Sequence, residues 1–227
     1  FSSVSDTLGY THNQRFDLPG GSLDSTALNG WGSAEVFIIN RGYNTEGAHM
    51  GFRKLQINEA TAAQFEVTFG TLESTGGSTV TIPRNSDYNY TFLNLETGQL
   101  VDAEPSKTTW DLVFTQYTHL FYEPEQTPYL VTGCLLNSHE TRAVQVDDAI
   151  SFAEIDLDYA AGLELKERRN TIGYDWKTFT GNGFEINSDQ VYVIRDGEGY
   201  FYKLRFIDFY DDQGNKGTPN TGGDVYV

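Results

Sequence analysis

The side chains best suited to bind a metal in this 227-residue chain are four histidines: His12, His49, His119 and His139. None of them occurs in an H-E-x-x-H pattern or at another close ligand spacing, so the sequence predicts no conventional metal site. Met50 follows His49, and both side-chain types are good iron ligands. Neighbouring residues of an extended segment point in opposite directions, however, so one ion would not be held by both. His119 alternates with Tyr117 and Phe121 along a predicted strand.

The remaining reactive residue types indicate structural roles. Cys134 is the only cysteine, which excludes an internal disulfide, and its apolar setting favours a buried hydrophobe. Pairs of acidic residues are expected by chance in so acidic a chain, and we interpret them as solvated surface: Glu123/Glu125, Asp147/Asp148, Asp156/Asp158 and Asp211/Asp212. The segment 211–217 lacks the alternating ligands of a calcium loop, which favours a turn. Without a phosphate-binding loop or a G-x-S-x-G elbow, we predict no catalytic residue, no metal site and no enzyme.

Composition narrows the range of partners. The chain has 32 Asp and Glu against 15 Lys and Arg, a formal charge of −17 and a pI near 4.4. Binding to a nucleic acid or to an anionic lipid surface needs a basic patch, so we expect neither. Aromatic residues make up 14% of the chain, which argues for a folded globule despite the charge. No apolar run approaches the roughly 20 residues of a membrane-spanning helix.

Period-two alternation dominates the elements that must position these side chains. It predicts strands in segments that alternate apolar with polar residues: 35–39, 52–57, 64–69, 78–82, 88–92, 109–117 and 129–136. The second and third of these would be joined by a turn around Asn58 and Glu59. Residues 191–195, a turn at 196–199 and residues 200–209 predict a β-hairpin. The best helix candidate is 158–169, which Gly162 interrupts. We therefore predict an all-β fold of antiparallel sheets with at most one or two short helices.

A polar stretch at 102–106 contains Pro105 and separates two strand-rich halves. It suggests an N-terminal β-rich part, 1–104, and a C-terminal part, 105–227. One continuous domain is the alternative, because the strand that begins near Trp110 could extend the same sheet.

Four segments together carry a resemblance to a known family: Thr108–Tyr117, Tyr129–Asn137, Ile172–Lys177 and Val191–Tyr210. In this order they resemble the HmuY-like family of cell-surface proteins from Bacteroidota, and the part before about residue 85 is similar to the N-terminal half of longer relatives. The resemblance implies an all-β fold, export to the outer membrane or cell surface, and membrane contact only through an N-terminal lipid anchor that has been removed here. It also implies that haem is bound through two axial His or Met side chains and passed to an outer-membrane receptor.

Carried onto this chain, the resemblance makes His119 and His139 the candidate haem ligands. Between Leu163 and Asp189, where a family ligand is expected, the chain has neither His nor Met. Tyr174 could ligate iron, although packing is the more ordinary role for it. The one noticeable positive cluster of this half is formed by Arg142, Lys166, Arg168 and Arg169, and the last three are also explained as the charged face of a short helix.

Three functional hypotheses remain open at this point. The first is a non-enzymatic, exported ligand-binding protein, with haem as the family's default ligand. The second is an accessory or structural lipoprotein that docks in an outer-membrane protein complex. The third is a carbohydrate-binding or carbohydrate-degrading module that uses the abundant aromatic and carboxylate side chains.

Overall fold

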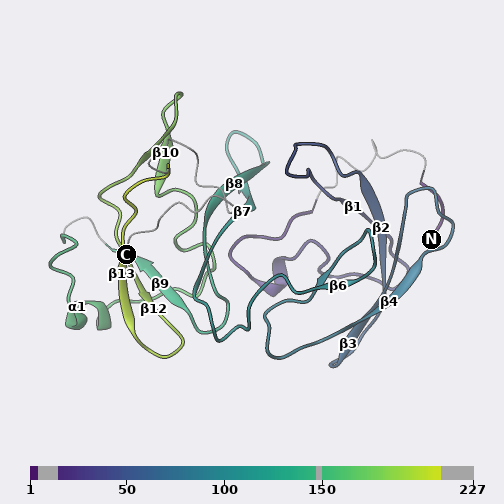
Figure 1. Ribbon diagram of the computed structural model, residues 1–227, viewed down its shortest axis with the longest axis horizontal. Helices are drawn as coiled ribbons and strands as arrows, with labels where there is room; N and C mark the ends of the chain where they lie inside the picture. The colour runs from purple at the N-terminus through teal and green to yellow at the C-terminus, as the bar shows by residue number, and fades with distance from the viewer. Residues whose placement is uncertain (5–14, 147–149, 211–227) are drawn as a thin grey trace. The chain divides into compact units, whose positions relative to one another are not determined.

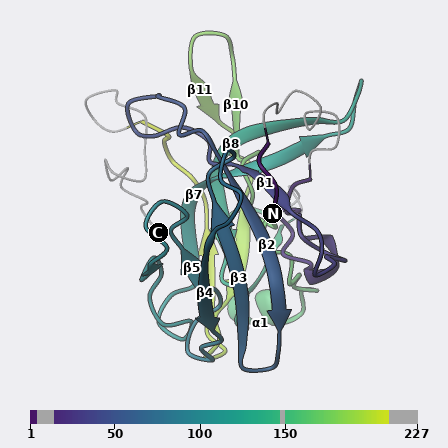
Figure 2. The same ribbon diagram turned by 90° about the vertical axis from the view of Figure 1, so that its right-hand side faces the viewer.

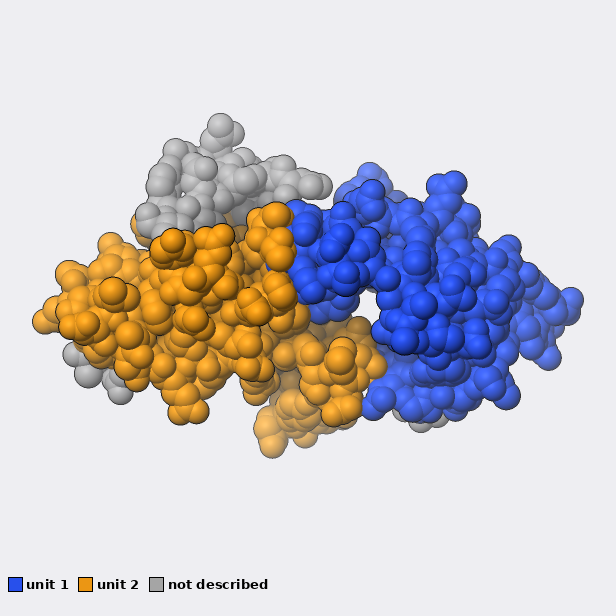
Figure 3. Space-filling view, turned by 90° about the horizontal axis from the view of Figure 1, so that it is seen from below, with its two compact units in different colours: residues 1–15, 27–107 blue, residues 16–26, 108–227 orange. Residues whose placement is uncertain are grey.

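The structure is a computed structural model that describes residues 1–4, 15–146 and 150–210. His12 and the acidic segments at 147–148 and 211–217 lie outside the described residues. The chain divides into two compact units, coloured separately in Figure 3. Unit 1 comprises Phe1–Arg15 and Ala27–Lys107, and unit 2 comprises Phe16–Thr26 and Thr108–Val227. The proposed division at residues 104 and 105 stays a prediction, because compactness alone does not show that a part folds independently.

Unit 1 is built on one antiparallel sheet. Its four strands lie in sequence order: β1 (Phe37–Asn40), β2 (Phe52–Ala60), β3 (Gln64–Gly70) and β4 (Ser78–Pro83). Leu55, Ile57 and Val67 are buried on one face of it and form its core. A two-stranded hairpin follows, made of β5 (Phe92–Leu93) and β6 (Leu100–Val101). Figure 2 shows β2, β3 and β4 running side by side.

The described part of unit 2 contains three antiparallel sheets. The longest is the hairpin of β7 (Leu112–Phe121) and β8 (Thr127–Leu136), whose ten residue pairs continue without interruption. The second has the order β13 (Phe201–Leu204), β12 (Tyr192–Arg195) and β9 (Arg142–Gln145), and the third pairs β10 (Lys177–Phe179) with β11 (Phe184–Ile186) (Figure 1). The helical elements among the described residues are α1 (Leu157–Ala161) and the 3-10 turn Leu23–Ser25.

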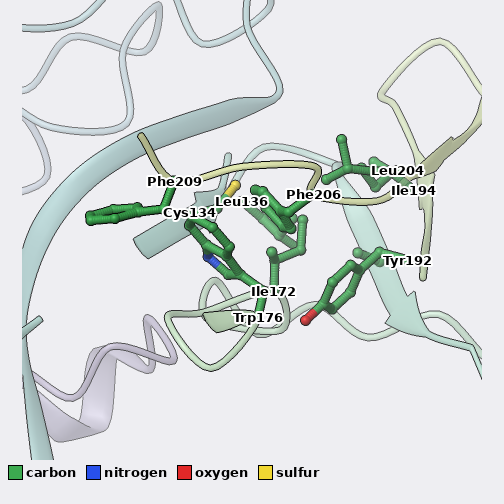
Figure 4. Packing of buried hydrophobic residues seen from close by; sticks show 10 residues of the cluster. Cys134, Leu136, Ile172, Trp176, Tyr192, Ile194, Leu204, Phe206 and Phe209 are labelled. Carbon is green, nitrogen blue, oxygen red and sulfur yellow. The ribbon is translucent and has the colours of Figure 1, made fainter. Parts of the chain in front are cut away.

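The main core of unit 2 forms around Trp176 (Figure 4). The Trp176 ring stacks on Phe206 with 3.9 Å between ring centroids and 12° between planes. Cys134 and Tyr192 are fully buried in the same cluster, which confirms Cys134 as a buried hydrophobe. Since Trp176 is anchored there, its neighbours in the segment 172–177 are held beside β8.

Backbone hydrogen bonds fix that segment along the free edge of β8. Cys134 and Gly173 each donate to the carbonyl of the other, at 2.7 and 2.9 Å, and the Leu136 amide donates to the Arg169 carbonyl at 2.7 Å. Gly173 has a φ of +68°, a left-handed conformation that favours glycine. Gly133 is required by proximity, because a Cβ there would lie 2.4 Å from the Gly173 carbonyl oxygen.

The all-β prediction is confirmed, and most of the predicted strands are present. The strand predicted at 88–92 is wrong apart from Phe92. An Asx turn lies just before this segment, and in that turn the Asp87 amide donates to the Asn85 side chain. The turn predicted at Asn58 is also wrong, since β2 continues to Ala60 through an irregular register between Ile57 and Glu59.

The predicted helix is much shorter than its pattern suggested. Asp156 caps its first turn by accepting from the Tyr159 amide at 2.9 Å, and the helix ends at Ala161. Gly162 follows as the C-cap, because glycine lowers helix propensity and favours a helix end. Lys166 instead bridges Ala143 of β9, so Lys166–Arg169 is not a helical face. No described helix combines the length and apolar composition that crossing a membrane requires.

Candidate functional site

His119 lies on β7, near the end of the hairpin that leads into its loop. The ladder pairs it with Tyr129 of β8. Because side chains alternate along a strand, Tyr117 and Phe121 share its face, and the paired Tyr129 does so too. The even-numbered Cys134 belongs to the opposite face. The alternation read from the sequence therefore brings an imidazole and several aromatic rings together.

A fourth ring comes from the segment that lies along β8. The centroid of the Tyr174 ring is 4.8 Å from that of His119, at an interplanar angle of 60°. Phe121 is also 4.8 Å from His119, and it lies 6.1 Å from both Tyr129 and Tyr174. We call His119, Phe121, Tyr129 and Tyr174 the hairpin cluster. Phe121 and Tyr129 are 37% and 61% exposed, so the cluster presents aromatic surface to solvent.

The surroundings of His119 favour its neutral form. Burial lowers its pKa below the ordinary value of 6.5, and the opposing effect of Asp175 is smaller. The imidazole is therefore uncharged at neutral pH, which is the form that binds metals. Its Nδ1 is buried and has no hydrogen-bond partner among the described residues. The ring as a whole is half-buried.

The tyrosines around His119 stay protonated. Burial raises the pKa of Tyr174 and, more strongly, that of Tyr117, and the negative charge of Asp175 adds to both shifts. A phenol that resists ionisation is a poor ligand for iron, which in proteins binds the deprotonated tyrosine oxygen. Tyr174 therefore contributes an aromatic ring to the cluster, and the neutral His119 is the better candidate for binding a metal.

Lys177 links the Tyr174 segment to β8 through hydrogen bonds. Its buried ammonium donates to the Thr132 carbonyl at 2.6 Å and to the Tyr174 carbonyl at 3.3 Å. It also lies over the Trp176 ring, 4.1 Å from the centroid. Burial lowers the pKa of Lys177 to about 8, with Asp175 opposing the shift. The sequence gives no sign of this role, because a lysine that follows a tryptophan carries no signal of burial.

The second candidate ligand lies at the other end of the hairpin. His139 comes three residues after the end of β8, where Leu136 pairs with Leu112. His119 is seven residues from Leu112 along β7, which corresponds to about 23 Å at about 3.3 Å per residue. Metal–nitrogen bonds are only about 2 Å long. The structure therefore does not bring His119 and His139 together as two ligands of one iron.

The remaining ligand candidates with described positions belong to unit 1. His49 Nε2 lies 2.9 Å from Asn40 Oδ1, and its ring packs against Tyr43 and Phe52. Met50 is largely exposed beside it. No group of three or more His, Cys, Asp or Glu residues in the described part of the chain is arranged to hold a metal ion.

Two arginines of unit 2 pair with groups outside the hairpin cluster. Arg142 forms an ion pair with Glu167 at 3.0 Å. The Arg169 guanidinium donates to the Leu136 carbonyl at 3.3 Å, at the end of β8 remote from His119. Between residues 108 and 141 the chain contains no Lys or Arg, so the hairpin itself carries no permanent positive charge.

Comparison with known proteins gives one family match. A family model described as HmuY protein matches residues 86–221. That range includes β7, β8 and all of the hairpin cluster. No curated protein matches the chain, and no solved structure does either.

Proposed function

The chain belongs to the HmuY family, and from this premise we propose that it is a non-enzymatic, exported surface protein that binds haem at the hairpin cluster, with His119 as an iron ligand. Family membership supports a surface protein of haem-binding type in general. The ligand, the residues that bind it, the outer-membrane location and the lipid anchor are parts of the proposal.

The observation that carries the proposal is a neutral imidazole set among aromatic rings on an exposed strand face. Haem presents a broad apolar plane and an iron atom that accepts the lone pair of an imidazole. His119 offers the lone pair of a neutral imidazole. Phe121, Tyr129 and Tyr174 offer ring faces and edges around it. The donor set and the apolar surface therefore fit the group.

The surrounding charge favours one orientation of the bound haem. Its propionates are negative, and the hairpin offers them no Lys or Arg between residues 108 and 141. Lys177, three residues after Tyr174, is buried and already donates to two carbonyls. Haem bound at the cluster would therefore turn its propionates toward water.

A second function, docking in an outer-membrane protein complex, is favoured by another observation. Tyr122, which follows the last residue of β7, and Leu130 of β8 are about as exposed as Tyr129. Exposed large apolar residues that gather in one place mark interaction surfaces. This hypothesis predicts that an outer-membrane receptor contacts the hairpin end. A stoichiometric receptor complex that persists in a Tyr122→Ser, Leu130→Ser variant would contradict a receptor contact at this end of the hairpin.

The test of haem binding is a hemin titration followed by absorbance. The wild-type protein should give a sharpened Soret band at equimolar hemin, and His119→Ala should lose most of that change. His139→Ala is the matched control, since it removes a histidine at the opposite end of the same hairpin, and its titration should match that of the wild type. A spectrum of free hemin in the presence of wild-type protein would refute the proposal.

A further inference from the structure

The loop that joins β1 to β2 carries two exposed aromatic side chains, Tyr43 and His49, and it lies outside the residues 86–221 that match the family. An isolated antiparallel bridge pairs these two residues. We infer that they form, together with Asn40, a binding site for a neutral sugar ring, so that unit 1 binds carbohydrate. This site shares no residue with the hairpin cluster, and the inference is independent of haem binding.

The first support is an accessible aromatic ring. Tyr43 is 71% exposed, more than any other described Phe, Trp or Tyr. The His49 ring is tilted against it, with 5.3 Å between ring centroids, and meets Phe52 edge-on at 5.2 Å. The carbon-bound hydrogens on the face of a pyranose are slightly positive and are attracted to the negative face of an aromatic ring. A sugar can therefore lie on Tyr43 without displacing core residues.

The second support is unused hydrogen-bonding capacity beside that ring. Asn40 Oδ1 accepts from the Gly42 amide at 3.0 Å and lies 2.9 Å from His49 Nε2. Because this oxygen can only accept, Nε2 must carry a hydrogen, and Nδ1 of the neutral ring keeps its lone pair. The described residues supply no partner for Nδ1 or for the two hydrogens of the Asn40 amide.

These groups match what a sugar presents. A pyranose has apolar faces and a rim of hydroxyls, and each hydroxyl both donates and accepts. The hydroxyls of one sugar ring can donate to the His49 imidazole and accept from the Asn40 amide while its face lies on Tyr43. An aromatic surface with a few placed polar groups is the usual composition of a small-ligand site.

The third support is that the loop is ordered before any ligand arrives. Asn44 Oδ1 accepts from the amides of Glu46 and Ala48, at 3.1 and 2.8 Å. The Asn44 amide donates to the Ala48 carbonyl at 3.0 Å, and the Met50 amide donates to the Gly42 carbonyl at 2.8 Å. A site that is already ordered loses little conformational entropy on binding.

The surrounding charge favours a neutral sugar over an acidic one. Arg41 and Arg53 are the arginines closest to the loop in the sequence, and both already form ion pairs with Glu96. Arg41 also donates to the Met50 carbonyl at 3.1 Å. The whole chain carries a charge of −17, which repels an acidic glycan at long range. The expected ligand is therefore an uncharged sugar unit of a glycan.

The experiment is a titration of the full ¹⁵N-labelled chain, followed by NMR, with cellohexaose, maltohexaose, mannohexaose and xylohexaose. Hexagalacturonic acid is the acidic comparison. At least one neutral oligosaccharide should shift the amides of Asn40, Tyr43 and His49, with a Kd of about 1 mM or lower, and hexagalacturonic acid should bind at least about tenfold more weakly.

The variants assign the binding to the ring. Tyr43→Ala should weaken it by about tenfold, since aromatic contacts contribute measurably to affinity, whereas Tyr43→Phe keeps the ring and should stay within about threefold of the wild type. His49→Ala should also weaken it. Tyr200→Ala is the matched control, because Tyr200 is 63% exposed on the turn between β12 and β13, and it should bind like the wild type.

Four results would overturn the inference. They are no amide shift with any neutral oligosaccharide at about 10 mM, shifts confined to other strands, tighter binding of hexagalacturonic acid, and a loss in Tyr200→Ala equal to that in Tyr43→Ala. The hemin titration of Tyr43→Ala should match that of the wild type. Failure of sugar binding and failure of haem binding are therefore separate results.

Discussion

Gly133→Ala tests the close approach of the Tyr174 segment to β8. An alanine Cβ at this position would lie 2.4 Å from the Gly173 carbonyl oxygen, 2.8 Å from the Gly173 carbonyl carbon and 3.0 Å from the Tyr174 Cα. All three are backbone atoms, and ordinary carbon–oxygen contacts begin near about 3.3 Å. The segment must therefore move by about 1 Å, which strains the two hydrogen bonds between Cys134 and Gly173.

The expected cost follows from this displacement. Overpacking costs about 1–3 kcal/mol, and the clash with hydrogen-bonded backbone places Gly133→Ala in the upper part of that range. At about 2–4 °C per kcal/mol for a chain of this size, the Tm should fall by roughly 4–12 °C. The same movement carries Tyr174 away from His119, so hemin affinity should fall as well.

Gly162→Ala is the control for Gly133→Ala. Gly162 has a φ of −83°, and a Cβ there would lie 3.5 Å from the nearest atom, the Tyr159 carbonyl oxygen, which is an ordinary contact. Its free energy of unfolding should stay within about 0.5 kcal/mol of the wild type. Thermal unfolding followed by circular dichroism measures both variants. If Gly133→Ala unfolds at the same temperature as Gly162→Ala, the described approach of the two backbones is incorrect.

Three further predictions concern titratable groups. Burial lowers the pKa of Lys177 to about 8 from 10.5, so between these values the unfolded chain keeps a proton there that the folded chain releases. The free energy of unfolding of the wild type, measured by urea titration at each pH, should therefore rise between about pH 8 and pH 10 relative to that of Lys177→Met. The same dependence of the unfolding free energy on pH in both proteins would contradict this prediction. Burial raises the pKa of Cys134 to about 12, so a thiol reagent should label it only after denaturation, and rapid labelling of the native protein would exclude its buried position. Burial lowers the pKa of His119, so its bond to iron should persist to a lower pH than that of free imidazole. In an optical pH titration of the hemin complex, loss of the iron bond at or above pH 6.5 would be inconsistent with that environment.

Strands with regular alternation could be predicted from the sequence, because a half-buried strand needs alternating polarity. The segment 64–69 matches β3 within one residue. The segment 88–92 alternates equally well but is irregular before Phe92. Just ahead of it the Asn85 side chain accepts from the Asp87 amide and so offers the backbone a local partner. Short strands such as β10 and β11 have three residues each, too few for a periodic signal.

The site was predictable only in part. The alternation of Tyr117, His119 and Phe121 indicated that they share one strand face, and the ladder agrees. The contribution of Tyr174 could not be read in the same way. It depends on the pairing of Gly173 with Cys134, which joins residues 39 positions apart and leaves no mark in either local pattern. The separation of His119 from His139 likewise depends on the register of the hairpin.

The location of bound hemin tests the central claim most directly. Ferric iron is paramagnetic and broadens the NMR signals of nearby nuclei, so ¹⁵N spectra with and without one equivalent of hemin locate it on the chain. The amides of Phe121, Tyr129 and Tyr174 should broaden, while those near His139 should remain sharp. Broadening centred on His139, or spread over the strands of unit 1 with the hairpin cluster unaffected, would contradict the proposed site.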